Sequence, residues 1–140
     1  MLPQEQLTGQ IIAAAIEVHR ALGPGFLEAI YENALALELN SRGLVIERQK
    51  VVPVTYRGTK VGEHRLDLLV QGSVIVELKA ATDLDPIFFA TLRSYLKALH
   101  LETGLLLNFA ATPLTVKRVG REAVTRPRTG VEVQPPLTST

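Results

Sequence analysis

Residues 65–79 constrain the fold of this chain more than any other stretch, because they alternate with period two on both sides of a Gly-centred turn. Apolar residues occupy every second position of each arm, and Gln-Gly-Ser lies between the arms. This pattern predicts a β-hairpin. If the apolar residues of both arms share one face, Val70 pairs with Val74 and Leu68 pairs with Val76.

The same register places two carboxylates, those of Asp67 and Glu77, directly opposite each other. Opposed residues have Cβ atoms roughly 4.5–5.5 Å apart, and two like charges at that separation repel by about 3 kcal/mol at an effective dielectric near 20. A divalent cation between them would turn the repulsion into ligation, since hard cations bind carboxylate oxygens. Lys79 is expected on the same face. The other interpretation is a solvent-exposed strand face on which Lys79 relieves part of the repulsion.

Composition excludes several classes of function. The chain has 140 residues, of which 46% are hydrophobic and 21% charged, as in a globular protein with one core. The absence of cysteine excludes disulfide frameworks, thiolate zinc sites and cysteine nucleophiles. A net charge of +1 means that any binding of a polyanion must come from a local patch. With no targeting signal and no apolar run of membrane-spanning length, we expect a cytoplasmic protein without a membrane partner.

Two helices are expected before the hairpin. The first begins at an N-cap, Thr8, and ends near Leu22, after an ill-ordered lead-in over residues 1–7. Gly-Pro-Gly at residues 23–25 then interrupts the helical pattern. The second helix is predicted over residues 26–41, and its expected core stripe consists of Leu27, Ile30, Ala34 and Leu37.

The elements after these helices form the predicted sheet. Residues 44–79 read as a three-stranded antiparallel meander, and Asp85-Pro86 is typical of a helix start, with the helix running to about His100. The apolar run at residues 105–109 predicts a strand buried on both faces, parallel to the second arm of the hairpin. A short strand at residues 116–119 is also expected.

We therefore expect an α/β (α+β) fold with a mixed central sheet flanked by helices, in the order α-β-β-β-α-β. One domain spans residues 1–120. Residues 121–140 hold Pro, Thr and Arg without helical period and are expected to form a flexible tail, with a brief extended piece at residues 131–133.

This order of elements resembles the PD-(D/E)XK nuclease superfamily, which carries Asp on the second strand and Glu-x-Lys on the third. Residues 25–31, GFLEAIY, match G-x-x-E-x-x-Y. Together with VPVTYRGTKVGEHRLDLLV, VIVELKA and SYLKALHLETGLLLNFA, they resemble the bacterial GxxExxY proteins, which are grouped with that superfamily. The resemblance runs from about residue 8 to residue 120.

The resemblance implies a nuclease that hydrolyses phosphodiester bonds in nucleic acid, with DNA favoured over RNA. It implies four metal ligands, the carboxylates of Asp67, Glu77 and Glu28 and the backbone carbonyl of Leu78. Lys79 would position the attacking water. Oxygen ligands without cysteine favour Mg²⁺ or Mn²⁺ over zinc. Glu28 has a second interpretation, because a carboxylate in the first turn of a helix meets the positive end of the helix dipole.

Basic and aromatic residues around this set are candidates for nucleic-acid contact, and phosphate contacts of this kind are salt-dependent and carry no sequence specificity. They are Arg57, Lys60, Arg65, Arg93, Lys97 and Tyr95.

Three positions depart from related sequences: Thr91 replaces a usual glutamine, Phe88 a frequent histidine, and His64 a residue that is more often aromatic. These departures keep open an alternative, a catalytically weak nuclease-fold module that binds nucleic acid or a partner protein. A homodimer and a targeting partner protein also stay open.

Overall fold

A computed structural model of the protein describes residues 3–121. Within that range the chain forms three helices and five strands. Their bounds are α1 (Pro3–Leu22), α2 (Glu28–Ser41), β1 (Ile46–Tyr56), β2 (Thr59–Val70), β3 (Val74–Lys79), α3 (Pro86–Leu99), β4 (Thr103–Asn108) and β5 (Thr115–Gly120). The expected tail, including the extended piece at residues 131–133, lies almost wholly outside the described residues.

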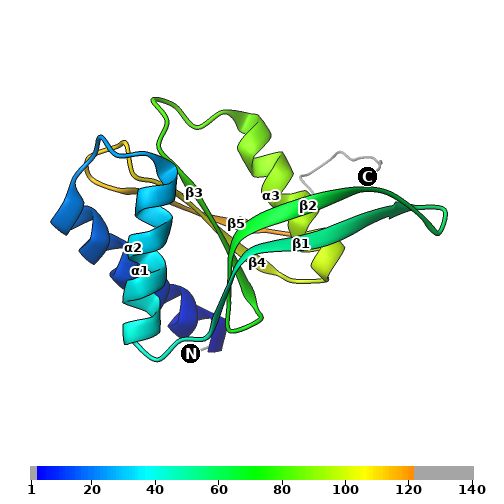
Figure 1. Ribbon diagram of the computed structural model, residues 1–140, viewed down its shortest axis with the longest axis horizontal. Coiled ribbons are helices and arrows are strands. Elements are labelled where there is room, and N and C mark those ends of the chain that lie inside the picture. The colour runs from blue at the N-terminus through cyan, green and yellow to red at the C-terminus, as the bar shows by residue number, and fades with distance from the viewer. Residues whose placement is uncertain (1–2, 122–140) are drawn as a thin grey trace, which may run out of the picture.

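The strands form one mixed sheet in the order β1-β2-β3-β4-β5 (Figure 1). Strands β3 and β4 are parallel and joined through α3, while the other neighbouring pairs are antiparallel. The hairpin register is confirmed, since Val70 pairs with Val74 and Leu68 with Val76. Helices α1 and α2 pack on one face of the sheet and α3 on the other. The expected α+β architecture is confirmed.

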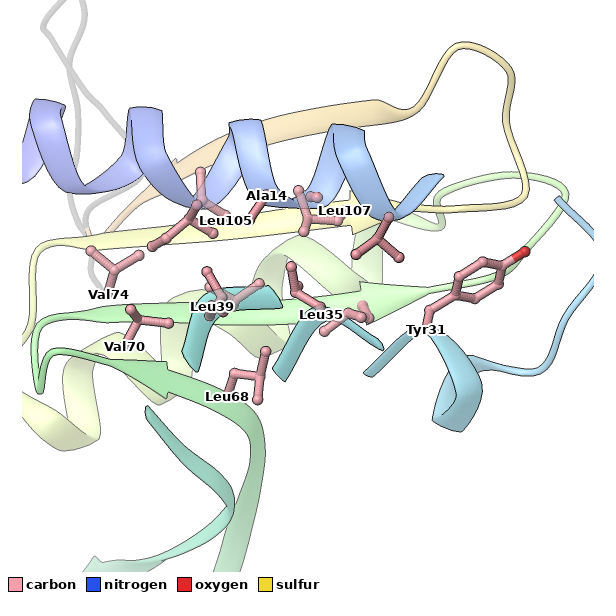
Figure 2. Close-up of a cluster of buried hydrophobic side chains, with 14 of the residues drawn as sticks. Ala14, Tyr31, Leu35, Leu39, Leu68, Val70, Val74, Leu105 and Leu107 are labelled. Atoms are coloured by element: carbon pink, nitrogen blue, oxygen red, sulfur yellow. The ribbon is translucent and has the colours of Figure 1, made fainter. Parts of the chain in front are cut away.

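The larger core lies between the sheet and the two N-terminal helices. Figure 2 shows Tyr31, Leu35 and Leu39 of α2 among side chains of α1 and of the sheet. The Tyr31 ring stacks on Phe109 with 4.6 Å between the ring centroids, and its hydroxyl donates to the Gly23 carbonyl at 2.5 Å. This contact ties the Gly-Pro-Gly connection to the core. The residues from α1 and the sheet that Figure 2 labels are Ala14, Leu68, Val70, Val74, Leu105 and Leu107.

Helix α1 begins earlier than the sequence predicts. It starts at Pro3, and Thr8, the expected N-cap, is fully buried within it. Gln4 explains the longer helix, because its side-chain amide donates to the Ser73 carbonyl and accepts from the Thr103 hydroxyl. Leu7 also packs against the core. Tertiary contacts therefore fix a turn that has no capping signal of its own.

The core stripe expected for α2 is wrong. Leu27 and Leu37 are 76% and 72% exposed, whereas Tyr31, Leu35 and Leu39 are fully buried. Apolar residues occur on both sides of this helix, so two stripes satisfy the 3.6-residue period equally well. The stripe that carries the aromatic ring faces the sheet, because the ring fills the space beside Phe109.

We expect Leu35→Ala to lower the free energy of unfolding by about 2–5 kcal/mol, because it leaves a cavity in the core. The matched variant Leu37→Ala should change it by less than about 0.5 kcal/mol, because that side chain is 72% exposed. Denaturant unfolding of both variants measures the difference. Equal losses would contradict the orientation of α2.

The remaining elements agree closely with expectation. The Asp85 side chain accepts a hydrogen bond from the Ile87 N–H at 2.9 Å and so caps α3. Strand β4 is buried along almost its whole length. No helix among residues 3–121 is long and apolar enough to cross a membrane.

Candidate functional site

The candidate site lies at a fork in the sheet. The ladder between β2 and β3 ends at Leu68 and Val76, but β2 continues with β1 as far as the pair Tyr56 and Thr59. Leu66, just beyond the fork, packs in the cluster on the α3 face instead of sharing a face with Leu68, which corrects the simple alternation expected from the sequence. The strands thus separate where the opposed carboxylates were predicted.

Asp67 and Glu77 bridge this fork with their side chains. The Asp67 N–H donates to Glu77 Oε2 at 2.9 Å, and the Leu78 N–H donates to Asp67 Oδ2 at 2.9 Å. Each carboxylate therefore takes the place of a ladder carbonyl on the opposite strand. The two side chains are fixed side by side by the backbone, and each keeps one oxygen that these two bonds do not use.

Glu77 is held in an electrostatically unfavourable position. Its side chain is only 8% exposed, and burial first and the Asp67 charge second raise the pKa of Glu77 to about 8. The Asp67 backbone N–H and the Lys79 charge act in the opposite direction. Glu77 thus keeps its proton at neutral pH in the protein alone. A bound cation would favour the ionised form.

We expect the free energy of unfolding, measured with a chelator present, to fall as pH rises from about 4.5 to about 8. In that window the unfolded chain releases the Glu77 proton while the folded chain keeps it, so stability is full below 4.5 and is lost up to the folded pKa of about 8. The slope should approach about 1 kcal/mol per pH unit. Glu77→Gln should remove it, and the exposed-site control Glu17→Gln should not. Parallel pH profiles for wild type and Glu77→Gln would contradict this assignment.

The helical glutamate that approaches the pair is Glu32, not Glu28. Glu28 is exposed at the first residue of α2, and its carboxylate forms no hydrogen bond or ion pair among residues 3–121. Glu32, one turn later, is 7% exposed, and its charge contributes to the raised pKa of Glu77. Tyr31 and Glu32 lie on the buried face of α2 and Glu28 lies in solvent, so the role predicted for Glu28 in metal binding stays a prediction.

Gln49 of β1 connects Glu32 to the pair, and no sequence pattern indicates this role. Its side-chain amide donates to Glu32 Oε1 at 2.8 Å and, more weakly, to Asp67 Oδ1 at 3.4 Å. Arg48 donates to the other Glu32 oxygen at 3.1 Å. Gln49 has a left-handed backbone with φ 51°, and it lies opposite Asp67 between two regular pairs. This irregularity interrupts an otherwise regular strand and brings the Gln49 amide between the carboxylates of Glu32 and Asp67.

Lys79 ends β3 next to Glu77 and Leu78. Its Nζ atom lies 4.3 Å from the centroid of the Phe88 ring, so the aromatic residue that departs from related sequences contacts the lysine directly. Asn108 holds the following loop, because it accepts from the Ala81 N–H at 3.2 Å and donates to the Ala81 carbonyl at 2.9 Å. A buried polar residue in the apolar run at 105–109 was the available signal for this anchor.

Of the predicted nucleic-acid contacts, Tyr95 borders the carboxylates and Arg65 contacts Gln49, the residue that bonds Asp67. Burial first, and then the charges of Glu77 and Asp67, raise the pKa of Tyr95. Its ring packs edge-on against His64 with 4.4 Å between the ring centroids. Arg65 donates to the Gln49 carbonyl at 3.4 Å.

The other predicted contacts are not brought to the pair. Lys60 lies near the far end of β2 and forms an ion pair with Glu63 at 2.9 Å. Arg93 and Lys97 lie on α3, and no contact among residues 3–121 links either of them to the carboxylates.

Asp67 and Glu77 supply two of the oxygen ligands that a hard divalent cation requires. Asp67 and Glu77 each have a second oxygen, and the raised pKa of Glu77 marks a place where positive charge is favourable. Within the described residues, no three or more His, Asp and Glu side chains converge closely enough to hold a metal ion by themselves. This is compatible with Mg²⁺, which is commonly bound through one or two carboxylates and completed by water and substrate phosphates.

Comparison with known proteins identifies the class. The sequence model of the PD-(D/E)XK nuclease superfamily matches residues 5–119, so the chain belongs to that superfamily. No curated protein matches the chain. A solved structure titled "Crystal structure of SSO0001" is similar in fold, with a TM-score of 0.54 and 18% sequence identity. The match covers 66% of this chain and 48% of the other, so this chain spans about half the length of that structure.

Proposed function

We propose that the protein is a Mg²⁺- or Mn²⁺-dependent nuclease that hydrolyses phosphodiester bonds. The observation that carries the proposal is the pair of cross-bonded carboxylates, Asp67 and Glu77, at a fork in the sheet beside Lys79. Two carboxylates held this close repel each other, so a purely structural role does not explain their placement, whereas a bound cation does. Membership of the superfamily supports the reaction class.

The residues of the site have distinct proposed roles. Asp67 and Glu77 would hold the cation together with the Leu78 carbonyl, and Glu32 would take the place first assigned to Glu28. When bound, the cation supplies a polarised phosphoryl oxygen and a water of lowered pKa. Lys79 orients that water and stabilises negative charge on the phosphate through its compact ammonium group. Gln49 and Arg48 orient the Glu32 carboxylate.

We propose DNA as the preferred substrate, held at its phosphates by basic side chains around the site. Arg65 and Tyr95 are the nearest of these candidates, while Lys60, Arg93 and Lys97 would contact phosphates farther away. The match of residues 25–31 to G-x-x-E-x-x-Y supports a finer proposal, that the chain is a GxxExxY protein. In this chain Tyr31 of that motif has a structural role, since it bonds the loop carbonyl of Gly23.

A second candidate function is a catalytically weak module that binds nucleic acid or a partner protein. The cation–π contact between Lys79 and Phe88 supports it, because an ammonium held on an aromatic ring is less available to a phosphate. So does the lack of three converging ligands among residues 3–121. Exposed Ile30 and Leu37 on α2, with exposed Leu27 just before it, support a protein interface, with a second copy or a targeting partner as its occupant.

The test is cleavage of labelled DNA and RNA, single-stranded and double-stranded, with Mg²⁺, Mn²⁺ or a chelator. We expect products only with a divalent ion and only from the protein with Asp67 intact. Binding without cleavage under every metal condition would favour the second candidate.

A further inference from the structure

Beyond the fork, β1 and β2 continue as a two-stranded arm that extends away from the helices (Figure 1). The base of this arm packs on α3 through Val52 and Leu66. From there to the turn at Arg57 and Gly58, most residues on both faces are exposed. A two-stranded ribbon is marginally stable by itself in water. A binding partner that covers the exposed faces would stabilise the arm.

The outer edge of the arm, along β1, is poorly suited to another β-strand. Pro53 lies in the middle of β1 and removes a backbone donor, and Gln49 interrupts the strand with its left-handed conformation. Such features are used to prevent edge-to-edge pairing of sheets. This argues against strand addition by a second copy or a partner protein.

The charge of the arm points to a polyanion. Four basic residues and one acidic residue lie between Lys50 and Arg65, which gives this segment a net charge of +3. The whole chain carries +1, so all other residues together carry −2. Two of the four basic side chains form ion pairs, Lys60 with Glu63 at 2.9 Å and Lys50 with Glu47 at 3.1 Å, so Arg57 and Arg65 are the cations of the arm that have no ion pair among residues 3–121. The positive charge of the protein is therefore concentrated on the arm.

The tip combines a cation with an aromatic ring. Arg57 and Gly58 have φ values of 52° and 79°, as in a two-residue type I′ turn, where Asn or Asp is normally favoured in the first position. The Arg57 guanidinium lies 5.3 Å from the centroid of the Tyr56 ring, and Tyr56 is 62% exposed. An arginine at a position that disfavours it, stacked on an exposed ring, suits contact with phosphates and bases.

We propose that this arm enters the major groove of double-stranded DNA while the carboxylate pair at its base faces the sugar-phosphate backbone. The proposal rests on the proposed nuclease function and specifies its substrate. Eight residues separate Asp67 from the turn along β2, a span of roughly 25–30 Å in extended chain, or slightly less than one turn of B-DNA. The B-form major groove, about 12 Å wide, admits a two-stranded ribbon. The narrow major groove of an RNA duplex does not.

The test compares wild type, Arg57→Asn and Lys117→Asn in binding to a labelled DNA duplex of about three helical turns, with a chelator present to prevent cleavage. Asn suits the turn, so the thermal midpoint of Arg57→Asn should not fall. Lys117 is an exposed lysine on β5, the opposite edge of the sheet, and controls for the loss of one charge.

We expect Arg57→Asn to bind the DNA duplex about tenfold more weakly than wild type. Its slope of log affinity against log salt should be shallower by about 0.9. Lys117→Asn should match wild type in both measurements. An RNA duplex and single-stranded DNA of the same sequence should show no effect of Arg57→Asn, because neither offers the wide groove.

Equal binding of the DNA duplex by wild type and Arg57→Asn would overturn the arm proposal, as would equal effects on all three nucleic acids or no binding by wild type. Cleavage assays with Mn²⁺ separate this failure from failure of the nuclease function. Metal-dependent cleavage that is insensitive to Arg57→Asn would leave the nuclease standing and remove the arm. Duplex binding that is weakened by Arg57→Asn, without cleavage under any metal, would support the arm proposal and contradict the nuclease function.

Discussion

Asp67→Asn is expected to abolish saturable Mn²⁺ binding and to lower the rate of phosphodiester cleavage by about 10³-fold or more. The variant removes one of the two carboxylates that would hold the cation, and stabilisation by a catalytic metal is worth several kcal/mol. The fold should survive, because an asparagine oxygen can still accept the hydrogen bond that the Leu78 N–H now donates to Asp67. Calorimetric titration of Mn²⁺ into both proteins measures the first effect.

Stability provides a second readout for the same variant. The Asp67 charge is the second cause of the raised pKa of Glu77, so its removal should lower that pKa toward the ordinary value of 4.5 and leave the fold equally stable or slightly more stable at neutral pH. Glu17→Gln, an exposed carboxylate-to-amide change on α1, is the control and should behave as wild type. Unchanged Mn²⁺ affinity in Asp67→Asn would remove this site as the metal site.

At saturating Mn²⁺, Lys79→Met is expected to bind the metal as wild type does and to lower the rate of cleavage by about 10²–10³-fold, since it removes the positive charge that would stabilise negative charge on the phosphate. Methionine is chosen because it keeps an apolar stem against the Phe88 ring. The Lys79 charge also lowers the pKa of Glu77, so its loss raises that pKa further and weakens metal binding at neutral pH. Affinities should therefore be measured as a function of pH, because Glu77 in the variant ionises at a higher pH than in wild type.

Single-turnover cleavage at saturating Mn²⁺ separates the chemical role of Lys79 from its effect on Glu77. Lys117→Met, on the exposed face of β5, is the control for loss of a lysine and should cleave as wild type. If Lys79→Met and wild type cleave at the same rate under saturating metal, Lys79 has no catalytic role, and its contact with Phe88 is structural.

Short-range sequence patterns were sufficient to predict several elements of this protein. The alternation along residues 65–79 fixed the register of β2 and β3, because a one-residue slip would move half of the apolar side chains to the wrong face of the sheet. Asp85 fixed the start of α3 through a local hydrogen bond. The apolar run that became β4 marked a strand buried on both faces. From these elements the mixed sheet and the proximity of Asp67 to Glu77 followed.

Which of two equivalent faces or turns an element uses depends on packing between elements that are distant in the sequence. Helix α2 carries two apolar stripes, and the space beside Phe109 selected the one with Tyr31. That choice turned Glu32 toward the carboxylate pair and left Glu28 in solvent. The fork at Leu68 and the irregular backbone of Gln49 likewise have no local signature, because they depend on where one strand leaves its neighbour. Periodicity specifies which residues share a face, but packing between elements distant in the sequence specifies what that face meets.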